Sequence, residues 1–108
     1  MTLLAFDPVI HAPIRLQTCA ILASADQVEF GLLRDALRVS DSVLSKHLKQ
    51  LEEAKFVRLH KETSAGRLRT RLSLTAAGRK AFAAHVKALE TLAASALTCA
   101  HPVEEMRG

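Results

Sequence analysis

The apolar and polar positions of the chain divide it into short segments with helical or strand periods. Pro13 favours the start of a helix, because its missing N–H would have no partner in the first turn in any case. We expect this helix to span Pro13 to Ala23, with apolar residues on more than one face and hence more than one packing partner. A β-prone stretch at Val28 to Phe30 and a short helix over Gly31 to Leu37 follow, whereas the opening ten residues show no clear period.

A third helix is predicted from Asp41 to Ala54, and its start is well defined. Ser40 is a natural N-cap, and the carboxylate of Asp41 complements the positive end of the helix dipole. A stripe at helical spacing, typical of a face that packs on a core, comprises Leu44, Leu48 and Leu51. The opposite face is small, polar or basic and comprises Ser42, Ser45, Lys46, Lys49 and Gln50.

A β-hairpin is predicted next, with a first strand over Phe56 to Glu62 and a turn at Ser64 to Gly66. Its second strand, Arg67 to Thr75, alternates strictly and therefore has two different faces. One face comprises Leu68, Thr70, Leu72 and Leu74, and the other comprises Arg67, Arg69, Arg71 and Ser73. We expect the leucine face to be half-buried and the arginine face to meet solvent.

Thr75 is expected to cap a last, long helix over Ala76 to Leu97. At ~1.5 Å per residue this helix is roughly 33 Å long, which is more than a small core can cover. Its apolar positions step by four and three residues, the spacing that packs one helix along another, and they are Phe82, Val86, Leu89, Ala93 and Ala96. We therefore expect part of the helix to contact a second subunit, and the tail beyond Pro102 to be frayed.

The length of 108 residues favours one domain, and a hydrophobic content of 49% is rich for so small a chain, which also favours a subunit interface. The predicted fold class is mainly α with a small β-hairpin (α+β). We expect a single domain over 1–108, with a core at 13–84, an extension of the last helix at 85–98 that makes the dimer contact, and a tail at 99–108.

The chain has a net charge of +4, and the position of its cations matters more than their number. The stretch from Ser64 to Lys80 contains no acidic residue and five cations, namely Arg67, Arg69, Arg71, Arg79 and Lys80. Such a basic stretch favours a polyanionic partner, either nucleic acid or an anionic membrane surface.

Several classes of protein are disfavoured by what the sequence lacks. No apolar run approaches the roughly 18 residues of a membrane span, and the first residues do not resemble a secretory signal. Cys19 and Cys99 stand far apart outside any CxxC pattern, so we expect two reduced thiols in a cytoplasmic protein rather than a disulfide. No phosphate-binding glycine loop, HExxH or GxSxG occurs, so we expect no enzyme activity.

Two motifs resemble a known family. The run SDSVLSKHLKQLEEAKFV, residues 40–57, resembles the recognition helix and following strand of bacterial regulators of the MarR and ArsR type. The run LSLTAAGRKAF, residues 72–82, resembles the joint between strand and helix in MarR-like winged helix-turn-helix proteins. Lys55 departs from the pattern, because such regulators usually have glycine there; lysine in a left-handed conformation costs about 1 kcal/mol.

This resemblance implies a homodimer that places its third helices in successive major grooves of a pseudo-palindromic operator, and a role as a repressor. The expected DNA contacts are Ser42, Val43, Ser45, Lys46, His47 and Lys49 on the helix and Lys61, Arg67, Arg69 and Arg71 on the wing. The expected dimer contacts are Ile14, Ile21, Phe82, Val86, Leu89, Ala93 and Ala96.

Other interpretations stay open at the level of sequence. The lysines could form an ordinary solvated face, and the arginines could guard a strand edge. The same fold could dock an acidic protein partner or hold a small-molecule effector between the first and last helices. We expect no metal and no cofactor, although the first and last helices could bring together His11, Cys19, His85, Cys99 and His101.

Overall fold

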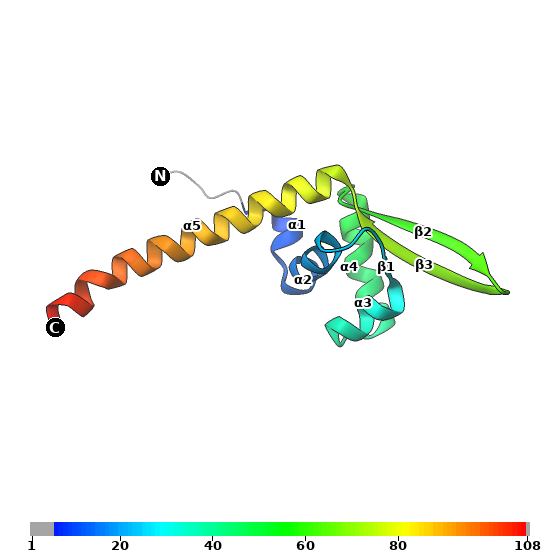
Figure 1. Cartoon of the computed structure of the whole chain (residues 1–108), viewed down its shortest axis with the longest axis horizontal. Helices are drawn as coiled ribbons and strands as arrows, with labels where there is room; N and C mark the ends of the chain where they lie inside the picture. The colour runs from blue at the N-terminus through cyan, green and yellow to red at the C-terminus, as the bar shows by residue number, and fades with distance from the viewer. Residues whose placement is uncertain (1–5, 108) are drawn as a thin grey trace.

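The computed structural model describes residues 6–107 and forms a winged helix-turn-helix core from which a hairpin and a long helix project (Figure 1). Its elements in chain order are α1 (Pro8–His11), α2 (Pro13–Ala23), β1 (Val28–Glu29), α3 (Phe30–Leu37), α4 (Asp41–Glu53), β2 (Val57–Ser64), β3 (Arg67–Leu74) and α5 (Ala76–Arg107). The strands form one antiparallel sheet in the order β1-β3-β2. The predicted helices and hairpin are confirmed within a few residues, apart from α1 and the end of α5.

The short helix α1 was not expected from the apolar pattern, and its capping explains why it forms. A carboxylate oxygen of Asp7 accepts hydrogen bonds from the backbone N–H groups of Val9 and Ile10, at 2.8 and 3.3 Å. Pro8 occupies the first helical position, where it loses no hydrogen bond. Ile10 is fully buried and attaches the helix to the core.

The core lies where α2, α3, α4 and the base of the hairpin meet. Fully buried leucines come from each of these elements, namely Leu22, Leu33, Leu44, Leu51 and Leu72. The leucine stripe of α4 therefore faces inward as its spacing predicted. Within the described part of the chain, none of the helices combines the length and apolar character that a membrane span requires.

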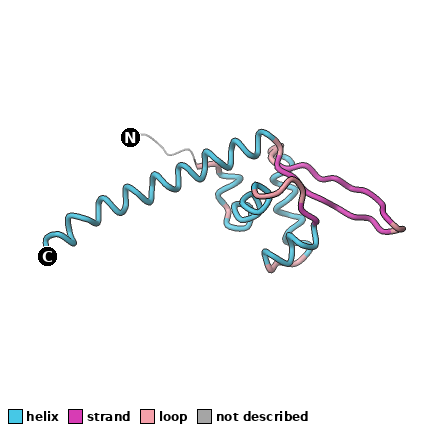
Figure 2. The backbone as a smooth tube through the Cα atoms, in the orientation of Figure 1, coloured by secondary structure: helices cyan, strands magenta, loops and turns pink. Residues whose placement is uncertain are grey.

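The hairpin extends well beyond this core as a two-stranded ribbon (Figure 2). Ala65 and Gly66 form its turn with φ of 53° and 76°, the paired positive values of the tight turn that suits the strand twist. Leu72 and Leu74 are buried, but Leu68 is 66% exposed. The expectation that Leu68 belongs to a half-buried face is wrong, because alternation fixes the face of a residue and not how far the core reaches along the strand.

The helix α5 continues to Arg107, so the prediction of an end near Leu97 is also wrong, whereas the fraying of the tail after Pro102 stays a prediction. Glycine, which commonly ends helices, is absent between Gly78 and Gly108, and alanine is frequent in this stretch. The helix extends past the core on the side opposite the hairpin (Figure 1), in a molecule that measures 67 × 26 × 22 Å.

The start of α5 is fastened to the end of α4, and Lys55 lies at this joint. Lys55 has φ of 66°, and the N–H groups of Lys55 and Phe56 donate to the carbonyls of Glu52 and Leu51, both at 2.9 Å. This pair of bonds is the usual helix ending in which glycine supplies the left-handed residue. The helix thus ends with the left-handed residue that the resemblance implied, and lysine is held in the strained position.

The motif at 72–82 fits against this same joint. The Thr75 hydroxyl donates to the carbonyl of Lys55 at 2.6 Å and accepts from the N–H of Gly78 at 2.9 Å. It therefore caps α5 and at the same time attaches α5 to the residues that follow α4. The N–H of Thr75 donates to the Phe56 carbonyl at 2.9 Å. A Cβ on Gly78 would lie 2.0 Å from that carbonyl oxygen, so only glycine permits this approach.

Candidate nucleic-acid interface

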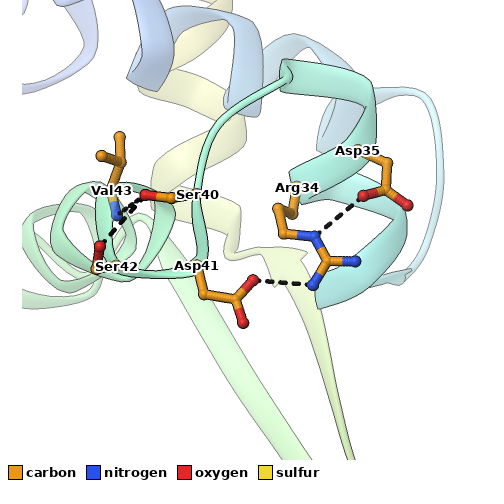
Figure 3. A network of polar contacts seen from close by, with 6 residues as sticks. All are labelled: Arg34, Asp35, Ser40, Asp41, Ser42 and Val43. Carbon is orange, nitrogen blue, oxygen red and sulfur yellow. Dashed lines mark hydrogen bonds and ion pairs between the residues drawn. The ribbon is translucent and has the colours of Figure 1, made fainter.

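The helix α4 is fixed at its N-terminus by a network of polar contacts (Figure 3). The Ser40 hydroxyl accepts from the Val43 N–H at 3.2 Å, as expected of an N-cap. Arg34 of α3 forms ion pairs with Asp35 at 3.0 Å and with Asp41 in the first turn of α4 at 2.8 Å. Arg34 therefore ties the two helices of the helix-turn-helix together, a role that its sequence position alone does not indicate.

One face of α4 is free within the described chain. Ser42, Ser45, Lys46 and Lys49 are exposed, and Val43 is 38% exposed. This face carries hydroxyl groups, a small apolar side chain and two cations, which together can contact base edges and phosphates. Five of the six expected contacts on this helix therefore lie on one accessible surface.

His47 is placed differently from the other expected contacts. It is half-buried, and its Nδ1 lies 3.1 Å from Nη1 of Arg15 in α2. Burial, and then the charges of Arg15 and Lys46, lower the pKa of His47, so the ring is neutral at pH 7. Arginine stays protonated, so Arg15 donates and His47 accepts. This contact fixes the middle of α4 against α2.

A cleft of about 460 Å³ lies between α4 and the hairpin, and three expected contacts share it. Ser45 and Lys49 line it from the helix, and Lys61 lines it from β2. Lys61 pairs with Thr70 across the strands, so the two side chains share the face that turns toward α4. The structure thus brings Lys49 and Lys61 to the two walls of one groove.

The three wing arginines lie on the opposite face of the hairpin. In the strand register Arg67, Arg69 and Arg71 stand opposite Ser64, Glu62 and His60. Arg69 forms an ion pair with Glu29 of β1 at 3.3 Å, and Arg71 forms one with Glu62 at 2.8 Å. Arg67, beside the turn, is exposed and has no ion pair among the described residues.

These ion pairs were missed because the acidic partners come from outside the basic stretch. Glu62 precedes the turn, and Glu29 reaches β3 only because β1 pairs with it at positions 71 and 72. The alternation of the first strand could have placed Glu62 on the arginine face. No local pattern could have predicted Glu29.

The expected dimer contacts differ in exposure. Phe82 and Ile21 pack partly against the core, and Ile14, Val86 and Leu89 are also half-buried. Ala93 and Ala96 are exposed, as are Leu92 at 47% and Leu97 at 71%. The part of α5 beyond Leu89 therefore has an uncovered apolar surface, while the part before it already packs on its own chain.

The histidines and cysteines considered as metal ligands do not form a cluster of three or more in the part of the chain that is described. His11 and His85 do meet, with their ring centroids 5.1 Å apart. Cys19 is a free, buried thiol, and burial followed by the charge of Asp7 raises its pKa to about 11. Cys99 and His101, the other two residues of that alternative, lie outside the residues whose side chains are described.

A family model described as a winged helix DNA-binding domain matches residues 14–93. The chain belongs to this family. The uncharacterized protein MJ0432 of Methanocaldococcus jannaschii is 35% identical over 74 residues, which are 68% of this chain and 80% of that protein. The family model's range, 14–93, includes α4, the hairpin and the first part of α5.

Solved structures share the fold at lower identity. A transcriptional regulator homologue from Pyrococcus horikoshii has a TM-score of 0.76 and 22% identity, covering 81% of this chain and 86% of its own. The DNA complex of Staphylococcus aureus MepR has a TM-score of 0.69 and 17% identity, covering 92% and 81%. The zinc-responsive MarR family member ZitR of Lactococcus lactis has a TM-score of 0.63 and 19% identity, covering 89% and 65%.

Proposed function

We propose that this winged-helix protein binds double-stranded DNA sequence-specifically as a homodimer and represses transcription by occupying a pseudo-palindromic operator. The observation that carries the proposal is the free face of α4, which presents Ser42, Ser45, Lys46 and Lys49 from a rigidly capped helix. A helix with such a face fits the major groove, where its first turns reach base edges.

The roles of the residues follow from their surroundings. Ser42, Val43, Ser45 and Lys46 read base edges, because they occupy the first two turns of α4. Lys49 and Lys61 bind the phosphates that pass the cleft between the helix and the hairpin. Arg67, next to the turn, reaches the backbone or minor groove of the adjacent turn of DNA.

His47, Arg69 and Arg71 contribute in a second way. His47 supports the helix through Arg15, and the exposed part of its half-buried ring is proposed to contact DNA beside Lys46. Arg69 and Arg71 already have carboxylate partners, so a phosphate must compete with Glu29 and Glu62 for them. Their contribution to affinity is therefore smaller than that of Arg67.

The homodimer is supported by the uncovered part of α5. The row of apolar positions predicted along this helix continues past the core through Ala93 and Ala96, beside the exposed Leu92 and Leu97. A second copy of the same helix would bury these residues and the half-buried Ile14, Ile21, Phe82, Val86 and Leu89 around a two-fold axis. That axis would place two α4 helices on one face of the duplex.

A mobility-shift comparison of three variants tests the proposal. Lys46→Ala should weaken binding to a selected site more than binding to random duplex, because it removes a contact to bases. Arg67→Ala should weaken both about equally and lower the salt slope by about 1. Lys87→Ala, on the exposed side of α5, is the matched control and should change neither. Equal loss in all three variants would contradict the proposed interface.

A further inference from the structure

The short helix α1 is attached to α5 through two histidines. The backbone N–H of Asp7 donates to Nδ1 of His85 at 3.1 Å, and Nε2 of His85 lies 3.2 Å from Nδ1 of His11. His85 has no exposed surface, whereas His11 is exposed. The ring of Phe6 stacks on His11 and lies tilted against His85, at centroid distances of 5.1 and 5.3 Å. The two imidazoles thus join the start of the fold to the long helix.

The direction of these bonds fixes where the protons lie. An amide N–H can only donate, so Nδ1 of His85 is unprotonated and its single proton is on Nε2. That N–H donates to Nδ1 of His11, which therefore is also unprotonated. The chain of bonds runs one way, from the Asp7 amide through His85 to His11, and it is complete only while both rings are neutral.

A further proton on either ring places two donors face to face. If His11 is protonated, its new Nδ1–H points at the Nε2–H of His85 across 3.2 Å. If His85 is protonated, its new Nδ1–H points at the N–H of Asp7 across 3.1 Å. In each case a hydrogen bond becomes a repulsive contact, and a cation is created either beside the buried ring of His85 or on it.

We propose that His11 and His85 form a proton-operated clasp, which holds α1 on α5 while both rings are neutral and releases it when either is protonated. The proposal is independent of whether the chain binds DNA. Its consequence reaches α4, because Arg15 donates from Nε to the carbonyl of Val9 in α1 and from Nη1 to His47 in α4. Release of α1 removes one of the two acceptors that hold the Arg15 side chain in place.

The charged and buried groups around the clasp determine whether it closes or opens as the pH falls. Burial, and then the neighbouring His11, lower the pKa of His85, while the charge of Asp7 acts the other way. The carboxylate of Asp7 is engaged in capping α1. The ionisable residues of α2 are Cys19, a buried thiol, and Arg15, which is bound to Val9 and His47. The clasp is therefore closed at neutral pH and opens as the solution becomes acidic.

A pH titration of the full ¹⁵N-labelled chain by NMR, from pH 8 to pH 5, tests the clasp. The amide signals of Asp7 and of α1 should leave their native positions in one transition, and the ring signals of His47 should follow it. His11→Asn keeps an acceptor oxygen near the place of Nδ1 but cannot be protonated. Its transition should move to lower pH, because only protonation of the buried His85, whose pKa is lowered by burial, can then break the chain of bonds.

His60→Gln is the matched control, because His60 is hydrogen-bonded to Ser73 at 2.9 Å and lies outside the clasp. Its transition should coincide with that of the wild type. Native α1 signals that persist unchanged to pH 5 would overturn the proposal, and so would an unshifted transition in His11→Asn. If that variant fails to fold, the wild-type ring spectrum decides: His85 protonated on Nε2 supports the clasp, and His85 protonated on Nδ1 at neutral pH rules it out.

Discussion

Replacement of Gly78 by alanine tests the contact that fastens α5 to the end of α4. The added Cβ would lie 2.0 Å from the carbonyl oxygen of Phe56 and 2.9 Å from its Cα. These are backbone atoms that cannot rotate away, so α5 and Phe56 must separate by roughly 1 Å to reach van der Waals contact. That movement disrupts the bonds from Thr75 to the carbonyls of Lys55 and Phe56, at 2.6 and 2.9 Å.

The expected loss follows from these changes. The two hydrogen bonds contribute about 1 kcal/mol each. Overpacking a tight contact costs about 1–3 kcal/mol. Alanine offsets about 1 kcal/mol of this by its better helix propensity. Gly78→Ala should therefore lower the free energy of unfolding by about 2–4 kcal/mol, a large part of the stability of a small domain.

Urea denaturation at one fixed protein concentration measures this change, since a dimer would make stability depend on concentration. Gly31→Ala is the matched control, because its Cβ would meet only the end of the Arg34 side chain at 3.6 Å. That variant should be unchanged or more stable by up to about 1 kcal/mol. A Gly78→Ala variant as stable as Gly31→Ala would refute the reasoning about this joint.

Three further perturbations have expected outcomes. Lys55→Gly should raise the free energy of unfolding by about 0.5–1 kcal/mol, because φ of 66° suits glycine, whereas Lys55→Ala should bring no gain. Glu29→Gln should raise the affinity for duplex DNA at low salt, because it frees Arg69 from its ion pair. Stability should fall as the pH drops below about 6.5, since His47 and His85 have lowered pKa values in the fold and the unfolded chain binds those protons more readily.

A different result would contradict each of these three predictions. Equal stability of Lys55→Gly and Lys55→Ala in urea would show that the left-handed position is unstrained. For Glu29→Gln, fluorescence anisotropy with a labelled duplex measures the affinity, and the matched control is Glu90→Gln, at an exposed α5 residue with no ion pair among the described residues. Equal affinity of the two variants would contradict the release of Arg69. Unfolding curves that coincide at pH 7.5 and pH 5.5 would contradict the neutral state of the two histidines.

Local signals in the sequence predicted most of the elements. The Ser40 cap, the leucine stripe of α4, the Ala65–Gly66 turn and the Thr75 cap all depend on residues close together in the chain, and each is present in the structure. The free face of α4 follows from the same stripe. These features are dictated by helix and strand geometry, which a sequence reveals directly.

Features that depend on distant contacts were not predictable in this way. The ion pair of Glu29 with Arg69 needs the pairing of β1 with β3, and the bond between Asp7 and His85 spans 78 residues. The sequence also does not reveal how far the core extends, which is why Leu68 is exposed. The strand alternation placed the wing arginines on one face, but only the structure shows that this face turns away from α4.

The salt dependence of binding to a duplex selected from a random library tests DNA recognition most directly. If each subunit of a dimer uses Lys49, Lys61 and Arg67 on phosphates, the logarithm of the binding constant should fall linearly with that of the salt concentration, with a slope of roughly −5. The selected sites should contain two related half-sites about 10 base pairs apart. Failure to enrich any sequence, together with binding to duplex DNA that is absent or insensitive to salt, would contradict a DNA-reading function for α4 and the wing.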